Sequence, residues 1–133
     1  MEPKLVYVEL KTGFSDDGPA WIGKASFSKT GKSVYFNGLL LKQNHRGSTG
    51  GNRYEINSGD IYWVSGIKKN EQDRHWAGSG KIQIDAGVIP EYLNLVNRQA
   101  LPKNKFEIVE LNNDPPKEAI NELENQKLSF ENE

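Results

Sequence analysis

Residues 59–85 read GDIYWVSGIKKNEQDRHWAGSGKIQID, and they carry the strongest indication of the architecture. The first part, Asp60–Val64, and the last part, Trp76–Ile84, hold the aromatic and β-branched residues that favour strands. The residues between these parts are mostly polar and carry charges of both signs. We therefore predict a β-hairpin over Asp60–Ile84, with a mixed-charge tip and aromatic residues at the root of each arm.

Several short strands surround this hairpin in the sequence. We predict strands over Lys4–Leu10, Ala20–Ser28, Ser33–Asn37, Leu39–Leu41, Tyr54–Ile56 (a short edge strand) and Phe106–Leu111. Residues 29–32 form a tight turn, and Gly38 permits a bulge or bend. Short strands with glycine-rich turns predict a mainly β protein, a small antiparallel β-barrel or strongly bent sheet. SH3-like and OB-like forms both remain open.

One or two short helices complete the prediction. The best helical pattern covers Val88–Val96, where Pro90 suits the first turn and the apolar residues recur at three-to-four spacing. We expect a single β domain over residues 1–113. Residues 114–133 hold six acids and two lysines, a net charge of −4, and should form an acidic tail that is partly helical or disordered.

Composition limits the class of protein. The chain has 133 residues and no cysteine, which excludes thiolate catalysis and cysteine-based metal centres. The N-terminal residues lack the pattern of a signal peptide, and no apolar run is long enough to span a bilayer. We expect a cytoplasmic protein that does not associate with membranes. Within residues 20–105, thirteen bases stand against six acids, a net +7, so the predicted β body is mildly basic.

Most catalytic patterns are absent or incomplete. Gly80-Lys81 resembles the end of a phosphate-binding loop, but His75 occupies the first glycine position and a strand follows, so a β-bend is favoured. Two histidines thirty positions apart predict no metal site.

Asp73 and His75 lie on one side of an extended chain and could form an acid–base pair. We favour a salt-bridged tip instead, with Lys68, Lys69 and Arg74 against Glu71 and Asp73. The pair Asp60 and Asp85 could be glycosidase carboxylates, but a turn or a helix cap is the more ordinary role.

Aromatic residues interleaved with bases remain as the functional pattern. Trp21, Tyr35, Tyr62, Trp63 and Trp76 occur on predicted strands near lysines and Arg74. Such rings can stack nucleic-acid bases, although most of them should fill the core of a small barrel. We expect the contact residues for a ligand or a nucleic acid to be Trp63, Lys68, Lys69, Arg74, His75 and Trp76.

The sequence also resembles a known family over about residues 4–96. The resemblance rests on GPAWIGKASFSKTGK (18–32), VYFNG (34–38), WVSGIKKN (63–70), QDRH (72–75), ID (84–85) and PEY (90–92). The family consists of small uncharacterised bacterial proteins that often carry the name 1-deoxy-D-xylulose-5-phosphate synthase. The synthase itself is a much longer thiamine-diphosphate enzyme with a Gly-Asp-Gly motif, where this chain has Gly59-Asp60-Ile61. The resemblance therefore implies a compact bacterial domain and supplies no catalytic residue to carry over. We expect no cofactor.

Three hypotheses about function follow. The first is a non-enzymatic binding or accessory module, whose partner is an unknown protein or nucleic acid. Its contact surfaces would be the hairpin over Asp60–Asp85 and the Lys42–Asn52 loop. The second is a single-stranded nucleic-acid-binding protein that uses Trp63, Trp76, Lys68, Lys69 and Arg74. The third and weakest is a small hydrolase-type enzyme that acts through Asp73, His75 and Asp85.

Overall fold

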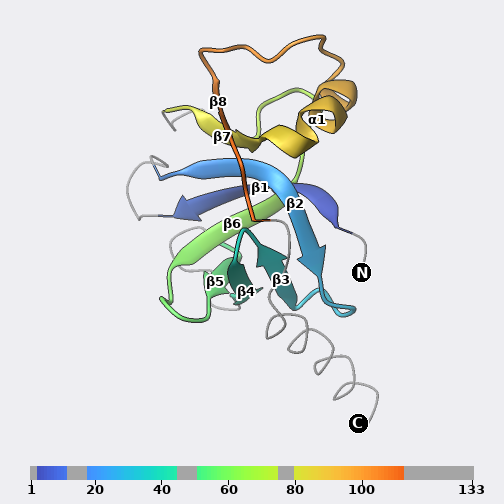
Figure 1. Cartoon of the computed structure of the whole chain (residues 1–133). Coiled ribbons are helices and arrows are strands. Elements are labelled where there is room, and N and C mark those ends of the chain that lie inside the picture. Colours follow the sequence, from blue (N-terminus) through green and yellow to red (C-terminus); the bar gives the residue numbers. More distant parts are fainter. Residues whose placement is uncertain (1–2, 12–17, 45–50, 75–79, 113–133) are drawn as a thin grey trace.

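The computed structural model describes residues 3–11, 18–44, 51–74 and 80–112 (Figure 1). These residues form eight strands, a short 3-10 helix and an α-helix. The strands are β1 (Lys4–Lys11), β2 (Ala20–Phe27), β3 (Ser33–Phe36), β4 (Leu39–Gln43), β5 (Arg53–Glu55), β6 (Ile61–Gly66), β7 (Ile82–Asp85) and β8 (Phe106–Val109). The helices are η2 (Ala86–Val88) and α1 (Ile89–Val96).

The first six strands close into an antiparallel barrel. Each strand pairs with the next along the chain, and β6 returns to pair with β1. This order is an up-and-down meander, which differs from the Greek-key connection of an OB-fold. The small antiparallel β-barrel predicted from the sequence is confirmed. The Tyr54–Ile56 prediction is corrected in its position, because β5 lies between β4 and β6 and is not an edge strand.

Alternating residues of the barrel strands fill its interior, as the two-residue period of a strand requires. The buried members are Val6, Val8, Ala25, Val34, Phe36, Leu41, Tyr62 and Val64. Trp21 packs at the margin of this core, with its ring 6.4 Å from that of Tyr62. Trp21 and Tyr62, two of the aromatic residues that could have stacked on nucleic-acid bases, therefore belong to the barrel core.

Local turn chemistry explains the β3–β4 connection. Asn37 and Gly38 have φ values of 48° and 80°, so both central residues of this two-residue hairpin are left-handed. An Asn-Gly pair tolerates this backbone, and the resulting turn matches the twist of the flanking strands. The bend expected at Gly38 is thus a tight hairpin turn. The predicted turn after β2 is also present, and Gly31 supplies its positive φ of 76°.

The hairpin predicted over Asp60–Ile84 is wrong. β6 pairs with β1 and β5, whereas β7 pairs in parallel with β2, so the two predicted arms are not neighbours. The physical reason is that closing the barrel uses both edges of β6. The chain after β6 must therefore leave the barrel, and it returns along the free edge of β2. β7 can run parallel to β2 because β3 to β6 separate these two strands along the chain.

A second layer covers the outer side of β1 and β2 (Figure 1). β2 pairs with β7 through Trp21 and Ile22 and with β3 through Ser26 and Phe27, so one edge of β2 serves both groups of strands. β8 adds to β7 in parallel, and α1 packs on this outer side. The buried residues of this second core are Tyr7, Ala20, Ile22, Ile82, Ile84, Val88, Tyr92, Val96 and Phe106. The strands predicted at the two ends of the body and the predicted helix are confirmed.

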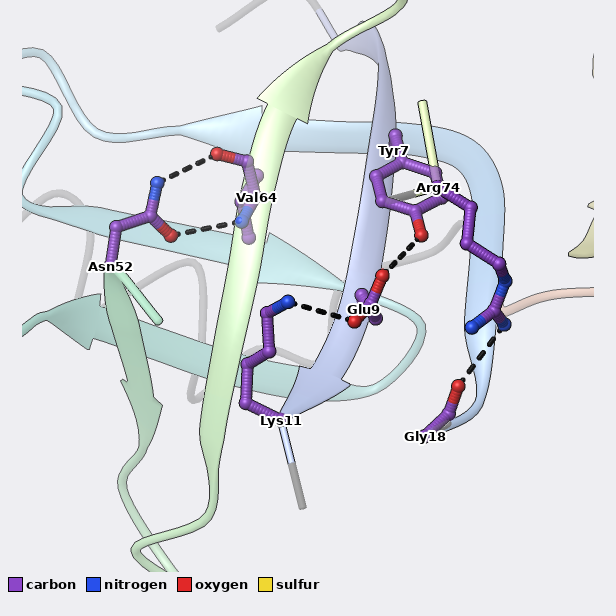
Figure 2. Close-up of polar contacts among 7 residues, drawn as sticks. All are labelled: Tyr7, Glu9, Lys11, Gly18, Asn52, Val64 and Arg74. Atoms are coloured by element: carbon purple, nitrogen blue, oxygen red, sulfur yellow. Dashed lines mark hydrogen bonds and ion pairs between the residues drawn. The ribbon is translucent and has the colours of Figure 1, made fainter. Parts of the chain in front are cut away.

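An asparagine side chain extends the barrel wall just before β5 begins. The Nδ2 atom of Asn52 donates to the Val64 carbonyl over 2.8 Å, and the Val64 N–H donates to Asn52 Oδ1 over 2.9 Å (Figure 2). The amide thus takes the place of a neighbouring peptide group, because it offers one donor and one acceptor. Gly51 must lack a side chain here, since a Cβ atom would lie 2.7 Å from the Tyr62 carbonyl oxygen. β4 runs to Gln43, so the first two residues of the loop predicted over residues 42–52 belong to a strand. Residues 45–50 of that loop and the whole predicted acidic tail lie outside the described residues.

Candidate functional site

A row of side chains crosses the outer face of four barrel strands. The registers place Lys42 of β4 opposite Tyr54 of β5, Tyr54 opposite Ile61 of β6, and Ile61 opposite Lys11 of β1. Residues that are directly opposite on neighbouring strands share a face and lie about 5 Å apart. Two apolar side chains therefore stand between two lysines on the outside of the barrel.

Trp63 lies diagonally from Tyr54 on the same face, two positions beyond Ile61 on β6. The side chains of Trp63 and Tyr54 are each 38% exposed, although most large apolar residues of the barrel are buried. Diagonal neighbours of this kind are within reach of each other when they are aromatic. We call Tyr54, Ile61 and Trp63 the exposed aromatic face.

A buried carboxylate borders this face. Glu9 of β1 lies directly opposite Trp63, and Glu9 is only 1% exposed. Its two oxygens accept hydrogen bonds from the Tyr7 hydroxyl over 2.5 Å and from Lys11 Nζ over 2.8 Å (Figure 2). Burial, together with the hydrogen bond to Glu9, raises the pKa of the Tyr7 hydroxyl well above its usual range. Tyr7 therefore stays protonated and acts as a hydrogen-bond donor.

The connection after β6 places a basic residue near this buried cluster. Arg74 extends along the same side as Tyr7 and Glu9, and its Nη2 donates to the Gly18 carbonyl over 3.1 Å (Figure 2). The neighbouring Asp73 is buried, and its Oδ1 accepts the Lys68 N–H over 2.7 Å. Its Oδ2 is buried without a hydrogen-bond partner in the part of the chain that the structure describes. The hydrogen bond from Lys68 to Asp73 thus stabilises the turn that follows β6. Burial of the Asp73 carboxylate opposes this stabilisation, because a buried charge is poorly solvated.

The stability of the protein should depend on the protonation of Asp73. Burial raises the pKa of this carboxyl above its ordinary value of 3.8, although the Lys68 N–H opposes the shift. As the pH rises from 3.8 through the raised pKa, the unfolded chain has lost a proton that the folded protein still holds. We therefore expect the free energy of unfolding to fall over that interval, and Asp73→Asn to lack this contribution. Urea unfolding of both proteins across the interval measures it. An offset that is the same at every pH would contradict the prediction.

The structure separates the contact residues expected from the sequence. Trp63 is on the exposed aromatic face, and Lys68 and Lys69 are exposed in the turn after β6. Arg74 is half-buried beside Tyr7 and Glu9. His75 and Trp76 lie outside the described residues. The acids of the predicted salt-bridged tip have other partners. Glu71 forms an ion pair with Arg98, which follows α1, and Asp73 accepts a hydrogen bond from a backbone N–H.

The structure gives the two carboxylates considered as a glycosidase pair ordinary positions, one at a helix cap and one in a turn. Asp85 ends β7, and its Oδ1 accepts from the Gly87 N–H at the start of η2 and from the Leu111 N–H, each over 3.4 Å. The helix-cap role expected for Asp85 is confirmed. Asp60 is exposed in the turn before β6. Among the described residues, no group of three or more histidines and carboxylates lies close enough together to hold a metal ion.

Two parts of this site escaped the sequence analysis. The sequence indicates only a short strand around Tyr54, although Tyr54 is an aromatic residue, as Trp63 is. Glu9 interrupts the apolar run of β1, and its spacing from Tyr7 and Lys11 places all three on one face. An acid in phase with a tyrosine and a lysine is the available signal for this buried cluster.

These features define a small up-and-down β-barrel with one covered side and one exposed aromatic face. No protein-family model, curated protein or solved structure gives a significant match to the chain. In the described part of the chain, no helix has the length and apolar character that crossing a membrane requires.

Proposed function

We propose that the chain is a small non-enzymatic binding or accessory module that contacts its partner through the exposed aromatic face. The observation that carries this proposal is the exposure of Trp63 and Tyr54, each 38%, at diagonal positions on neighbouring strands of the barrel wall. Large rings with few rotatable bonds contribute much of the energy of protein interfaces. The proposal includes no cofactor or metal. The cytoplasmic location and the place in the bacterial family that the sequence resembles are also proposals.

A single-stranded nucleic acid is the second candidate partner. Lys68 and Lys69 are exposed immediately after the strand that carries Trp63, and Lys42 lies beside Tyr54 in the row across the barrel. Bases can stack on exposed rings while lysines attract the phosphates. The mildly basic body supports this alternative, because basic charge favours polyanions.

A capture experiment with a matched control tests the proposal. Immobilised wild-type chain, Trp63→Ala and Leu95→Ala are exposed to a lysate of the encoding organism. Leu95 on α1 is 36% exposed, so both changes remove a large exposed apolar side chain. We expect a partner that wild type and Leu95→Ala retain, and for which Trp63→Ala lowers the affinity by about 30-fold, the effect of losing about 2 kcal/mol. If all three chains retain the same molecules equally, the aromatic face is not the contact surface.

Nuclease treatment separates the two candidate partners. A protein partner should remain bound after digestion of the lysate, whereas a nucleic acid should be lost. Titration with a single-stranded oligonucleotide then provides a direct measurement, because binding through phosphates weakens steeply with salt. Absence of oligonucleotide binding at low salt would rule out the second candidate and leave the first.

A further inference from the structure

β8 forms one end of the sheet. The order of the described strands ends at β8, which pairs with β7 only. The Ile82 N–H donates to the Lys105 carbonyl over 2.9 Å, and Ile82 is paired in register with Phe106. In a parallel ladder, this arrangement directs the backbone N–H and C=O groups of Phe106 and Ile108 away from β7. These groups therefore face the open edge of β8.

The side chains on this edge also suit a partner strand. Ile108 is 61% exposed, the most exposed large apolar residue of the described chain, whereas Ile84, its register partner on β7, is fully buried. An additional strand would continue this apolar surface from β7 across β8. Proteins often protect an edge strand with proline or lysine, and the segment Phe-Glu-Ile-Val has neither.

The charges around β8 complement one another in an antiparallel arrangement. Lys103 and Lys105 precede the strand, while Glu107 and Glu110 lie within and just after it. If two copies of β8 run antiparallel, the basic end of each extends toward the acidic end of the other. A parallel pair would instead bring like charges together, which is unfavourable. The charges therefore favour the antiparallel orientation, because it keeps the like-charged ends apart.

We propose that β8 pairs antiparallel with β8 of a second copy of the chain and joins the two sheets across a two-fold axis. The outward backbone groups limit the register. An axis at Glu107 would place two carboxylates opposite each other, which is destabilising. An axis at Phe106 would require Asn104, which lies in a turn, to act as a strand residue. An axis at Val109 would place the apolar Ile108 opposite Glu110 of the other copy, whereas an axis at Ile108 places the two Ile108 side chains against each other. We therefore choose the axis at Ile108. Such an interface is isologous, as in most dimers.

Solution mass tests this dimer. The chain has a mass of 15.0 kDa, so light scattering should give twice that value for wild type at high concentration. Ile108→Lys should shift the mass to that of one chain. Ile56→Lys makes the same change at another exposed isoleucine, 43% exposed, and should leave the dimer intact. A wild type that remains monomeric at the highest attainable concentration, or an Ile108→Lys variant that remains dimeric, would overturn the proposal.

Disulfide trapping tests the register and benefits from the absence of natural cysteine. Residues opposite each other in a hydrogen-bonded antiparallel pair have Cα atoms about 5.5 Å apart, which a disulfide can bridge. Ile108→Cys should therefore form a covalent dimer under mild oxidation, and much faster than Ile56→Cys does. Equal rates for the two variants would refute the Ile108-centred register. The exposed aromatic face takes no part in these tests, so their outcome is independent of the proposed function.

Discussion

Replacing Lys11 with methionine should lower the free energy of unfolding by about 3–5 kcal/mol, the usual cost of removing one partner from a buried ion pair. Lys11 Nζ lies 2.8 Å from Glu9 Oε2, and the two side chains are only 14% and 2% exposed. Methionine retains much of the aliphatic length but leaves the Glu9 carboxylate without its ammonium partner. Urea unfolding of the two proteins gives the difference directly.

A second ion pair supplies a matched control. Lys24 Nζ lies 2.7 Å from Glu91 Oε2, but these side chains are 31% and 51% exposed. Water screens such a pair, so Lys24→Met should cost less than about 1 kcal/mol. Adding Glu9→Gln to Lys11→Met should recover part of the loss, because the unpaired buried charge is removed. If Lys11→Met costs no more than Lys24→Met, the buried pair does not contribute as we infer.

The barrel itself could be predicted because its determinants are local. The β-branched and aromatic residues of β1 and the alternating pattern of β2 indicate strands, and glycine marks the turns between short strands. The pair Asn37-Gly38 is a strong signal for a two-residue hairpin. These signals act between residues close in sequence, so they indicate each strand and most of its nearest partners.

The partner of β7 could not be predicted in the same way. Its sequence, Ile-Gln-Ile-Asp, has the apolar–polar alternation of a strand. This alternation does not indicate which strand lies beside it. The choice between β6 and β2 depends on which edges remain free after the barrel closes, and that is a property of the whole fold. A strand next along the chain is the usual neighbour, which made the hairpin prediction reasonable and wrong.

In the candidate site too, residue types could be read from the sequence, but the side on which each residue lies depends on the whole fold. The residue type of Trp63 suggested a contact surface, and its exposure supports that suggestion without testing it. Whether a strand side chain faces the core or the solvent depends on register, so Tyr54 and Trp63 could not be assigned to one face beforehand. Glu9 lies between Ala20 of β2 and Trp63 of β6, two segments that only the folded chain brings next to β1.

Replacing Phe106 with alanine should lower the free energy of unfolding by about 3–5 kcal/mol, because the change leaves a cavity in the second core. Phe106 is 8% exposed, and its ring meets that of Tyr92 edge-on with centroids 5.5 Å apart. Ile108 lies on the same strand but is 61% exposed, so Ile108→Ala should change stability by only about 0.5 kcal/mol. Both variants are measured at one low protein concentration, so that self-association contributes little.

The cost at Phe106 should also extend to the barrel, because the two cores share a wall. Tyr7 and Ile22 face the second core, while Val6 and Val8 of the same sheet face the barrel interior. Loosening the layer of β7, β8 and α1 would uncover the outer side of β1 and β2, so we expect a single unfolding transition. Amide hydrogen exchange should then be faster at Val8 as well as at Ile84 in Phe106→Ala. Unchanged exchange at Val8 would mean that the barrel and its covering layer unfold independently.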